Sequence, residues 1–186
     1  MDSEAAVTVE DEARARRIER IVAAVEERRD HLIALIQDLV RIASLTGEEG
    51  TIQATVAARM RDDGLETDVW EPDPAELAPY AEHVGASDSF AGRPNVVGTL
   101  RGTGGGRSLI LNAHIDTVEP GDPATWTHPA FGAEIADGKV YGRGSCDMKA
   151  GLATNLVALV AVRAAGFAPR GDVIVQSVVS EEDGGA

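Results

Sequence analysis

The stretch NAHIDTV, residues 112–118, places a histidine and a carboxylate two positions apart, His114 and Asp116. It follows an apolar run, so it falls at the end of an expected β-strand. Alternate residues of a strand point to the same face, so both side chains would lie on one side. Two interpretations are open from these residues alone: a metal ligand with its supporting acid, or the polar end of a structural strand.

Two further polar clusters stand at the ends of predicted elements. Asp147 lies in GRGSCDMK after a glycine-rich turn, and Glu181 and Glu182 directly follow the apolar run 172–180. Taken alone, each cluster has a structural interpretation, such as a helix N-cap for Asp147 or a solvated acidic loop for the glutamates. Binding sites of α/β sheets gather at the carboxyl ends of strands. One imidazole and several carboxylates together suit Zn²⁺ or a similar divalent ion.

The spacing of apolar residues predicts the elements that would position these groups. Helices are predicted from Ile18 to Val40 as one long amphipathic helix, over 49–63 ending before Gly64, and over 147–165 ending before Gly166. Strands are predicted over 65–71, 95–102, 108–116 and 172–180, with a hairpin over 131–144 that turns at Asp137-Gly138. The continuous apolar run 108–116 is typical of a strand buried on both faces. Alternating strands and helices predict an α/β layered fold.

Composition limits the classes of partner and location. The chain has 186 residues and a net charge of −14, which argues against nucleic acid or an anionic membrane as a partner. Its single cysteine, Cys146, excludes an internal disulfide. No apolar run of membrane-spanning length and no signal-peptide pattern is evident, so we expect a cytoplasmic protein. Residues 1–13 are expected to be an acidic flexible N-terminus, and residues 72–94 a surface insertion.

Three segments together resemble the dinuclear zinc aminoacylase and carboxypeptidase superfamily, which includes acetylornithine deacetylase and succinyl-diaminopimelate desuccinylase. They are NAHIDTV, WTHPAFGAEIADGKVYGRGSCDMKAG and SEEDGG, in matching order and spacing, with GRPNVVGTL before them. The resemblance implies a zinc-exopeptidase-like fold with a mostly parallel central sheet and flanking helices. It also implies that residues 14–186 form the N-terminal part of the catalytic domain.

The resemblance assigns a role to each candidate residue. It implies that His114 binds one metal ion, Asp147 bridges two ions and Glu182 binds the second, the ions being Zn²⁺ or Co²⁺. Glu181 would be the general base, and Asp116 would hold the imidazole of His114. The implied reaction is amide hydrolysis, in which Glu181 takes a proton from water and passes it to the leaving amine.

The resemblance also implies a longer protein, with a lid or dimerisation domain and further ligands that this sequence does not contain. We therefore expect an incomplete ligand set in this chain and feeble or absent activity of the chain alone. A homodimer is expected of the full-length form. The preferred function is deacylation of an N-acyl amino acid, and a carboxypeptidase or dipeptidase acting on short peptides is the alternative. A hypothesis of another class is an inactive fragment that only binds a partner.

Overall fold

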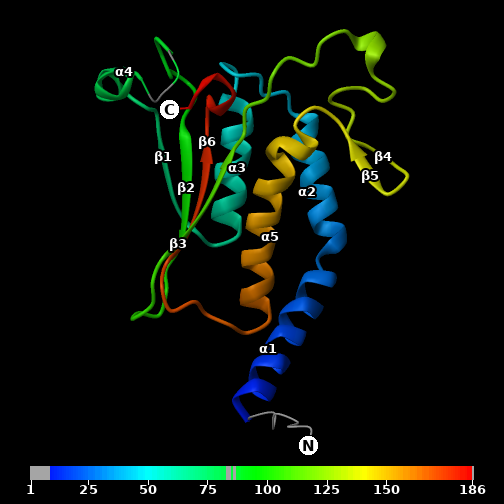
Figure 1. Cartoon of the computed structure of the whole chain (residues 1–186), viewed down its shortest axis with the longest axis vertical. Coiled ribbons are helices and arrows are strands. Elements are labelled where there is room, and N and C mark those ends of the chain that lie inside the picture. The colour runs from blue at the N-terminus through cyan, green and yellow to red at the C-terminus, as the bar shows by residue number, and fades with distance from the viewer. Residues whose placement is uncertain (1–8, 83–84, 86, 186) are drawn as a thin grey trace, which may run out of the picture.

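The structure, a computed structural model, describes residues 9–82, 85 and 87–185. Its α-helices are α1 (Val9–Glu26), α2 (Arg29–Arg41), α3 (Gly50–Asp62), α4 (Pro74–Leu77) and α5 (Ala150–Ala164). Its strands are β1 (Glu66–Trp70), β2 (Asn95–Leu100), β3 (Leu109–His114), β4 (Glu134–Ala136), β5 (Lys139–Tyr141) and β6 (Val173–Val178). Figure 1 shows the long helices beside the sheet, with the chain ending just after β6.

The α/β layered fold with flanking helices is confirmed, and its main sheet has the order β1-β2-β6-β3. The sheet is mixed within the described residues. β3 and β6 run parallel, as expected, whereas β1 with β2 and β2 with β6 are antiparallel. The connection from β1 to β2 contains the four-residue helix α4, and antiparallel neighbours need no crossover helix between them. The parallel pair matters for the site, because β3 and β6 end at the same edge of the sheet.

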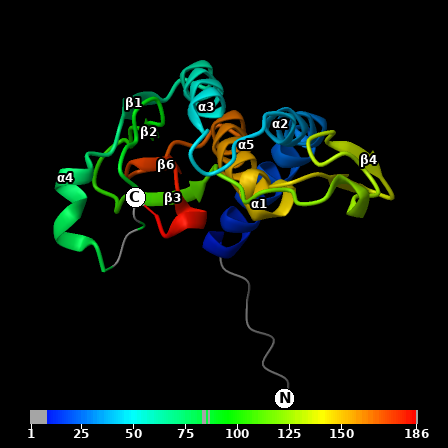
Figure 2. The ribbon, with the colours of Figure 1, turned by 90° about the horizontal axis from the view of Figure 1, so that it is seen from above.

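Helices α2, α3 and α5 lie on one face of this sheet, as the view from above shows (Figure 2). Burial alternates along β6, where Val173, Val175 and Ser177 are buried and the residues between them are only partly covered. The core lies between the sheet and the helices, and its fully buried members include Leu39, Ile52, Met60, Leu152 and Val175. This one-sided burial is the usual consequence of helices packing on a single face of a sheet.

The prediction that the strand over 108–116 is buried on both faces is wrong. Leu109 and Ile110 are 52% and 55% exposed, and burial begins only at Ala113 and His114. β3 stands at the edge of the described sheet, so its first residues lack a neighbour on one side. β6, the other apolar run, is instead central, between β2 and β3.

The predicted single helix from Ile18 to Val40 is two helices. α1 ends at Glu26 and α2 begins at Arg29, and the backbone of Arg28 between them has φ −106° and ψ 8°. No glycine or proline stands at this break, so apolar spacing could not reveal it. Ile18 and Val22, expected on a buried face, are about half exposed.

Two segments that were expected to be flexible or to lie at the surface contain regular structure or buried residues. Residues 9–13, predicted to belong to a flexible N-terminus, form the first turns of α1, while residues 1–8 lie outside the described part. The segment 72–94, expected at the surface, contains α4 and buries Phe90 and Arg93. Three of its residues, at 83, 84 and 86, also lie outside the described part.

Other local predictions are confirmed. The hairpin β4–β5 turns at Asp137-Gly138, both with positive φ, and Gly166 ends α5 with φ 80°. Contrary to expectation, the stretch Ser145–Ala164 is long and apolar enough, by length and composition, to cross a membrane. A helix in the core of a protein meets the same criterion of length and composition, so this finding alone does not indicate a membrane span. The regular helix α5 has 15 residues, fewer than a span requires, and it packs on α1, α2 and the sheet.

Candidate metal centre

His114 ends β3 and is buried, with its two ring nitrogens facing different partners. Nδ1 lies 3.0 Å from the backbone carbonyl of Asp116 and 3.4 Å from its carboxylate. Nε2 points the other way, 3.0 Å from Asp147 Oδ1 and 3.6 Å from Glu181 Oε2. A partner that holds Nδ1–H fixes the tautomer and leaves Nε2 to bind a ligand or metal.

The structure brings the three predicted metal ligands together. His114, Asp147 and Glu182 each offer one ligand atom, and these atoms lie within 4.8 Å of one another. The imidazole is buried, whereas the side chain of Asp147 is 78% exposed, so the group opens to solvent on one side. One imidazole nitrogen and two carboxylates are a donor set that fits Zn²⁺ or Co²⁺.

Asp147 lies in an irregular turn before α5. Its backbone has φ −121° and ψ 102°, and α5 begins three residues later, so Asp147 is not the N-cap residue of that helix. Lys149 follows it and is fully buried, with Nζ donating hydrogen bonds to the carbonyls of Leu39 (3.1 Å) and Ile42 (2.7 Å). This lysine therefore ties the turn that carries Asp147 to the end of α2.

Asp116 has a larger role than the predicted support of His114. It is fully buried, and its carboxylate accepts the backbone N–H of Glu181 (3.1 Å) and of Glu182 (3.0 Å). The hydroxyl of Thr46 donates a third hydrogen bond of 2.9 Å to it. The carboxylate thus joins the histidine at the end of β3 to the acidic pair after β6.

These contacts shift the pKa values of the two groups in opposite directions. The hydrogen bond with Asp116 raises the pKa of His114 to about 9, against the opposing effect of burial. Burial acts to raise the pKa of Asp116, but hydrogen bonds from His114, the Glu182 N–H and Thr46 outweigh it and lower the pKa. Without a metal ion the pair is therefore an imidazolium beside a carboxylate.

Several residues around the site were not identified from the sequence. Four of them contact the segments that carry predicted site residues: Thr46, Glu49, Arg93 and Asn95. The fifth, Lys149, lies on the turn of Asp147 and contacts the end of α2. Glu49 and Lys149 are fully buried, although a glutamate or lysine in a sequence normally indicates a solvated surface. Cys146, beside Asp147, is exposed and free.

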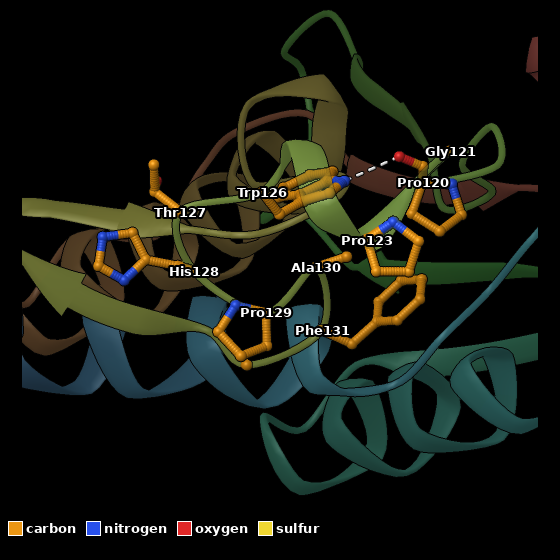
Figure 3. A pocket seen from close by; sticks show the side chains of 10 residues that line it. Pro120, Gly121, Pro123, Trp126, Thr127, His128, Pro129, Ala130 and Phe131 are labelled. Carbon is orange, nitrogen blue, oxygen red and sulfur yellow. Dashed lines mark hydrogen bonds between the residues drawn. The ribbon is translucent and has the colours of Figure 1, made fainter.

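The loop that leaves the site after Asp116 lines a cavity of about 700 Å³ that is open to solvent. Figure 3 shows Trp126, Pro123 and Phe131 around it, with the indole N–H of Trp126 donating to the carbonyl of Pro120 (2.8 Å). The guanidinium of Arg143 lies over the Trp126 ring at 5.5 Å. The cavity is lined mainly by proline and aromatic side chains and contains none of the candidate metal ligands.

In sequence, the chain is similar to curated proteins that are named as deacylases. The chain is 34% identical over 168 residues to N-formyl-4-amino-5-aminomethyl-2-methylpyrimidine deformylase of Bacillus subtilis (strain 168), covering 87% of this chain and 35% of the relative. It is 35% identical over 127 residues to succinyl-diaminopimelate desuccinylase of Methylorubrum populi, covering 68% of this chain and 29% of the relative. The chain thus spans about a third of the length of these relatives.

Comparison with solved structures supports the fold. Human carnosine dipeptidase 1 superimposes with a TM-score of 0.66 at 18% identity, over 86% of this chain and 34% of that one. Residues 110–186, which contain all five predicted site residues, match the sequence model of peptidase family M20/M25/M40. The resemblance to this group of metallohydrolases found in the sequence is confirmed, because this segment of the chain matches peptidase family M20/M25/M40.

Proposed function

We propose that this chain carries the metal-binding and proton-transfer half of a hydrolase that cleaves the amide bond of small N-acyl compounds. The observation that carries the proposal is the convergence of His114, Asp147 and Glu182 within 4.8 Å. Two relatives named as a deformylase and a desuccinylase support the removal of an acyl group from nitrogen. An N-acyl amino acid, as in acetylornithine deacetylase, is the preferred substrate class.

His114, Asp147 and Glu182 would hold the metal ion, Zn²⁺ or Co²⁺. When bound, the ion supplies Lewis-acid activation of the amide carbonyl and of the attacking water. The number of ions implied by the family resemblance is two, with Asp147 shared between them. Asp116 keeps His114 oriented, since it occupies the Nδ1 side of the ring while Nε2 faces the ligand group.

Glu181 is the residue that would move the proton. Its carboxylate lies 3.6 Å from Nε2 of His114 and its side chain is 57% exposed, so a water molecule and a substrate can reach it. It would take a proton from water as the water oxygen adds to the carbonyl carbon. It would then give that proton to the amide nitrogen as the C–N bond breaks, releasing an acid and an amine.

Hydrolysis of a peptide bond is the second candidate, favoured by the match to a peptidase family. The same residues would perform it, because a peptide and an N-acyl amino acid present the same amide group. A substrate of either class is a small molecule, as expected for a cytoplasmic protein. The residues that would distinguish the two classes are not among the five site residues.

The test is amine release by the purified chain loaded with Zn²⁺ or Co²⁺. N-formyl, N-acetyl and N-succinyl amino acids would be compared with dipeptides, each with and without metal. Metal-dependent release from the N-acyl compounds supports the proposal, and release from dipeptides alone would favour the peptidase. Binding of metal without hydrolysis of any substrate would contradict catalysis by this chain and favour a partner-binding role.

A further inference from the structure

The backbone of the acidic turn after β6 is held by side chains instead of by neighbouring strands or helices. Four consecutive N–H groups, those of residues 179 to 182, each donate to a side-chain oxygen. The acceptors are Asn95 Oδ1 for Val179 (3.0 Å), Glu49 Oε1 for Ser180 (3.2 Å), and the two oxygens of Asp116 for Glu181 and Glu182. Buried backbone donors such as those of Val179 and Ser180 require partners, and here three separate segments provide the acceptors for all four groups.

Ser180 is the residue at which this turn changes direction. Its φ of 61° and ψ of 23° lie in the left-handed region, which is unfavourable for a residue with a Cβ atom. Glu49 accepts its N–H, and Arg93 Nη1 donates to its hydroxyl at 2.9 Å. The conformation that turns the chain from β6 towards the acidic pair therefore depends on contacts from outside the turn.

Glu49 and Arg93 form a buried ion pair behind this turn. Arg93 Nη1 lies 3.3 Å from Glu49 Oε2 and 3.4 Å from Oε1, and the two residues are 9% and 0% exposed. Oε2 of Glu49 also accepts the N–H of Gly47 at 3.1 Å. Arg93 is fixed in turn by the hydroxyl of Ser87 (2.8 Å) and by the ring of Phe90 (4.9 Å).

A buried ion pair adds little net stability, because the desolvation of both charges offsets their attraction. Its geometric effect is more specific. Neither Glu49 nor Arg93 contacts the carboxylates of Glu181 and Glu182, yet both contact Ser180, the residue immediately before them. The pair thus acts on the acidic residues only through the direction of the backbone.

We propose that Glu49, Arg93 and Asn95 are positioning residues that orient the carboxylates of Glu181 and Glu182 and thereby set the metal affinity of the site. The inference rests on the proposed function for its metal-binding consequence. It assigns a role to the GRPN segment (92–95) and to the start of α3, neither of which contributes a ligand. We therefore expect substitution of these three residues to lower the metal affinity more than it lowers the free energy of unfolding.

The first readout is hydrogen–deuterium exchange of the metal-free chain. Asn95→Ala removes one acceptor and leaves the Glu49–Arg93 pair intact, so it is the variant expected to fold. Glu49→Gln leaves one acceptor oxygen for the two N–H groups of Gly47 and Ser180, which the two carboxylate oxygens now accept. We expect peptides covering 179–185 to exchange about 10-fold faster in Asn95→Ala and in Glu49→Gln. Asn95→Asp keeps an acceptor oxygen at the same reach and should restore slow exchange.

The second readout is Zn²⁺ affinity, measured by competition with a chromophoric chelator. Asn95→Ala and Glu49→Gln should weaken binding about 10–100-fold, as loss of groups that orient metal ligands does elsewhere. Gln53→Met is the matched control. Gln53 is equally buried and bonds to Ser177 of β6 by two hydrogen bonds, but it contacts no residue of the turn. It should lower stability and leave Zn²⁺ affinity unchanged.

Unchanged exchange at 179–185 in both variants would overturn the positioning role. Faster exchange with unaltered Zn²⁺ affinity would overturn its link to the metal site. An equal loss of Zn²⁺ affinity in Gln53→Met would also count against it, since general destabilisation would then explain the effect. Failure of the unmodified chain to bind Zn²⁺ would contradict the proposed function instead, and the exchange comparison would still decide whether these residues order the turn.

Discussion

The carboxylate of Asp116 accepts the backbone N–H of Glu182 at 3.0 Å across 66 residues of sequence, and that of Glu181 at 3.1 Å. The same residue holds Nδ1 of His114. One buried acid therefore fixes two candidate metal ligands, one through its ring and the other through its backbone. The end of β3 and the end of β6 are coupled at this point, which is possible because the two strands are parallel neighbours.

Asp116→Asn tests this coupling. An asparagine has one acceptor oxygen, so the N–H group of either Glu181 or Glu182 would face an NH₂ group and remain unpaired. We expect a loss of about 1–3 kcal/mol in the free energy of unfolding and a Zn²⁺ affinity about 10–100-fold weaker. Urea denaturation and chelator competition measure the two effects. Asp122→Asn, at an exposed turn, is the control and should change neither; a similar effect there would show that the coupling is not specific.

Metal uptake should release a proton from His114. Asp116 raises the pKa of this imidazole from 6.5 to about 9, so it is protonated at pH 7.5 in the metal-free protein, whereas a metal ligand must be neutral. Calorimetric titration with Zn²⁺ in two buffers of different ionisation enthalpy should give about one proton released per ion at His114. His128→Gln, which alters a histidine outside the site, should retain this release. Zn²⁺ binding without proton release would contradict the assignment.

The same shift affects the stability of the metal-free protein. Because the folded pKa of His114 lies above the unfolded value, its contribution is fully present below pH 6.5 and is lost as the pH rises through about 9. The native chain should therefore be more stable relative to the His114→Gln variant at pH 6.5 than at about pH 9, and this difference in the free energy of unfolding should fall as the pH rises between these values. Urea denaturation at a series of pH values measures the difference, and a constant difference would be inconsistent with the raised pKa.

Lys149→Met tests the link between the Asp147 turn and α2. The carbonyl of Ile42 would lose its lysine donor, whereas that of Leu39 would keep the backbone N–H of Ile42 at 3.3 Å. We expect the free energy of unfolding to fall by about 1–3 kcal/mol. Burial lowers the pKa of Lys149 from 10.5 to about 8, so between these values the unfolded chain binds more protons. The stability of the native chain relative to Lys149→Met should therefore rise with pH from about 8 to 10.5. A pH-independent difference would show that this lysine is not desolvated.

Glu181→Gln separates proton transfer from metal binding. Glutamine cannot accept the proton of the attacking water, so metal-dependent amine release should fall by about 10²–10⁴-fold. Metal content should stay close to that of the native chain, because Glu181 is not in the ligand group formed by His114, Asp147 and Glu182. Amine release and metal analysis on the same preparation measure both. Undiminished hydrolysis would assign the general base to another residue.

Residue type and position marked three polar clusters, those of His114 with Asp116, of Asp147, and of Glu181 with Glu182, and left their roles open. The family resemblance singled out His114, Asp147 and Glu182 as metal ligands, and the structure places these three together. Glu49, Arg93 and Asn95 carried no such signal. An acid beside Glu48 and Gly50 resembles a solvated helix start, and its burial depends on contacts with segments far along the chain.

In the fold, too, the features set by local backbone preferences were predictable from the sequence, whereas those set by long-range packing were not. The Asp137-Gly138 turn and the end of α5 at Gly166 are set by local backbone preferences, so the sequence predicted them.

The break at Arg28 and the exposure of Leu109 and Ile110 depend on packing and on the position of β3 in the sheet. Apolar spacing describes which residues could be buried, but not which neighbours are present to bury them.

The measurement that tests the account most directly is the metal content of the purified chain after incubation with Zn²⁺ and removal of excess ion. It is determined by mass spectrometry, with Glu182→Ala and His114→Ala beside the native chain and His128→Ala as the control. We predict bound Zn²⁺ in the native chain and in the His128 control, and a clear loss in both ligand variants. No bound Zn²⁺ in the native chain, or equal amounts in all four proteins, would contradict a metal centre at His114, Asp147 and Glu182.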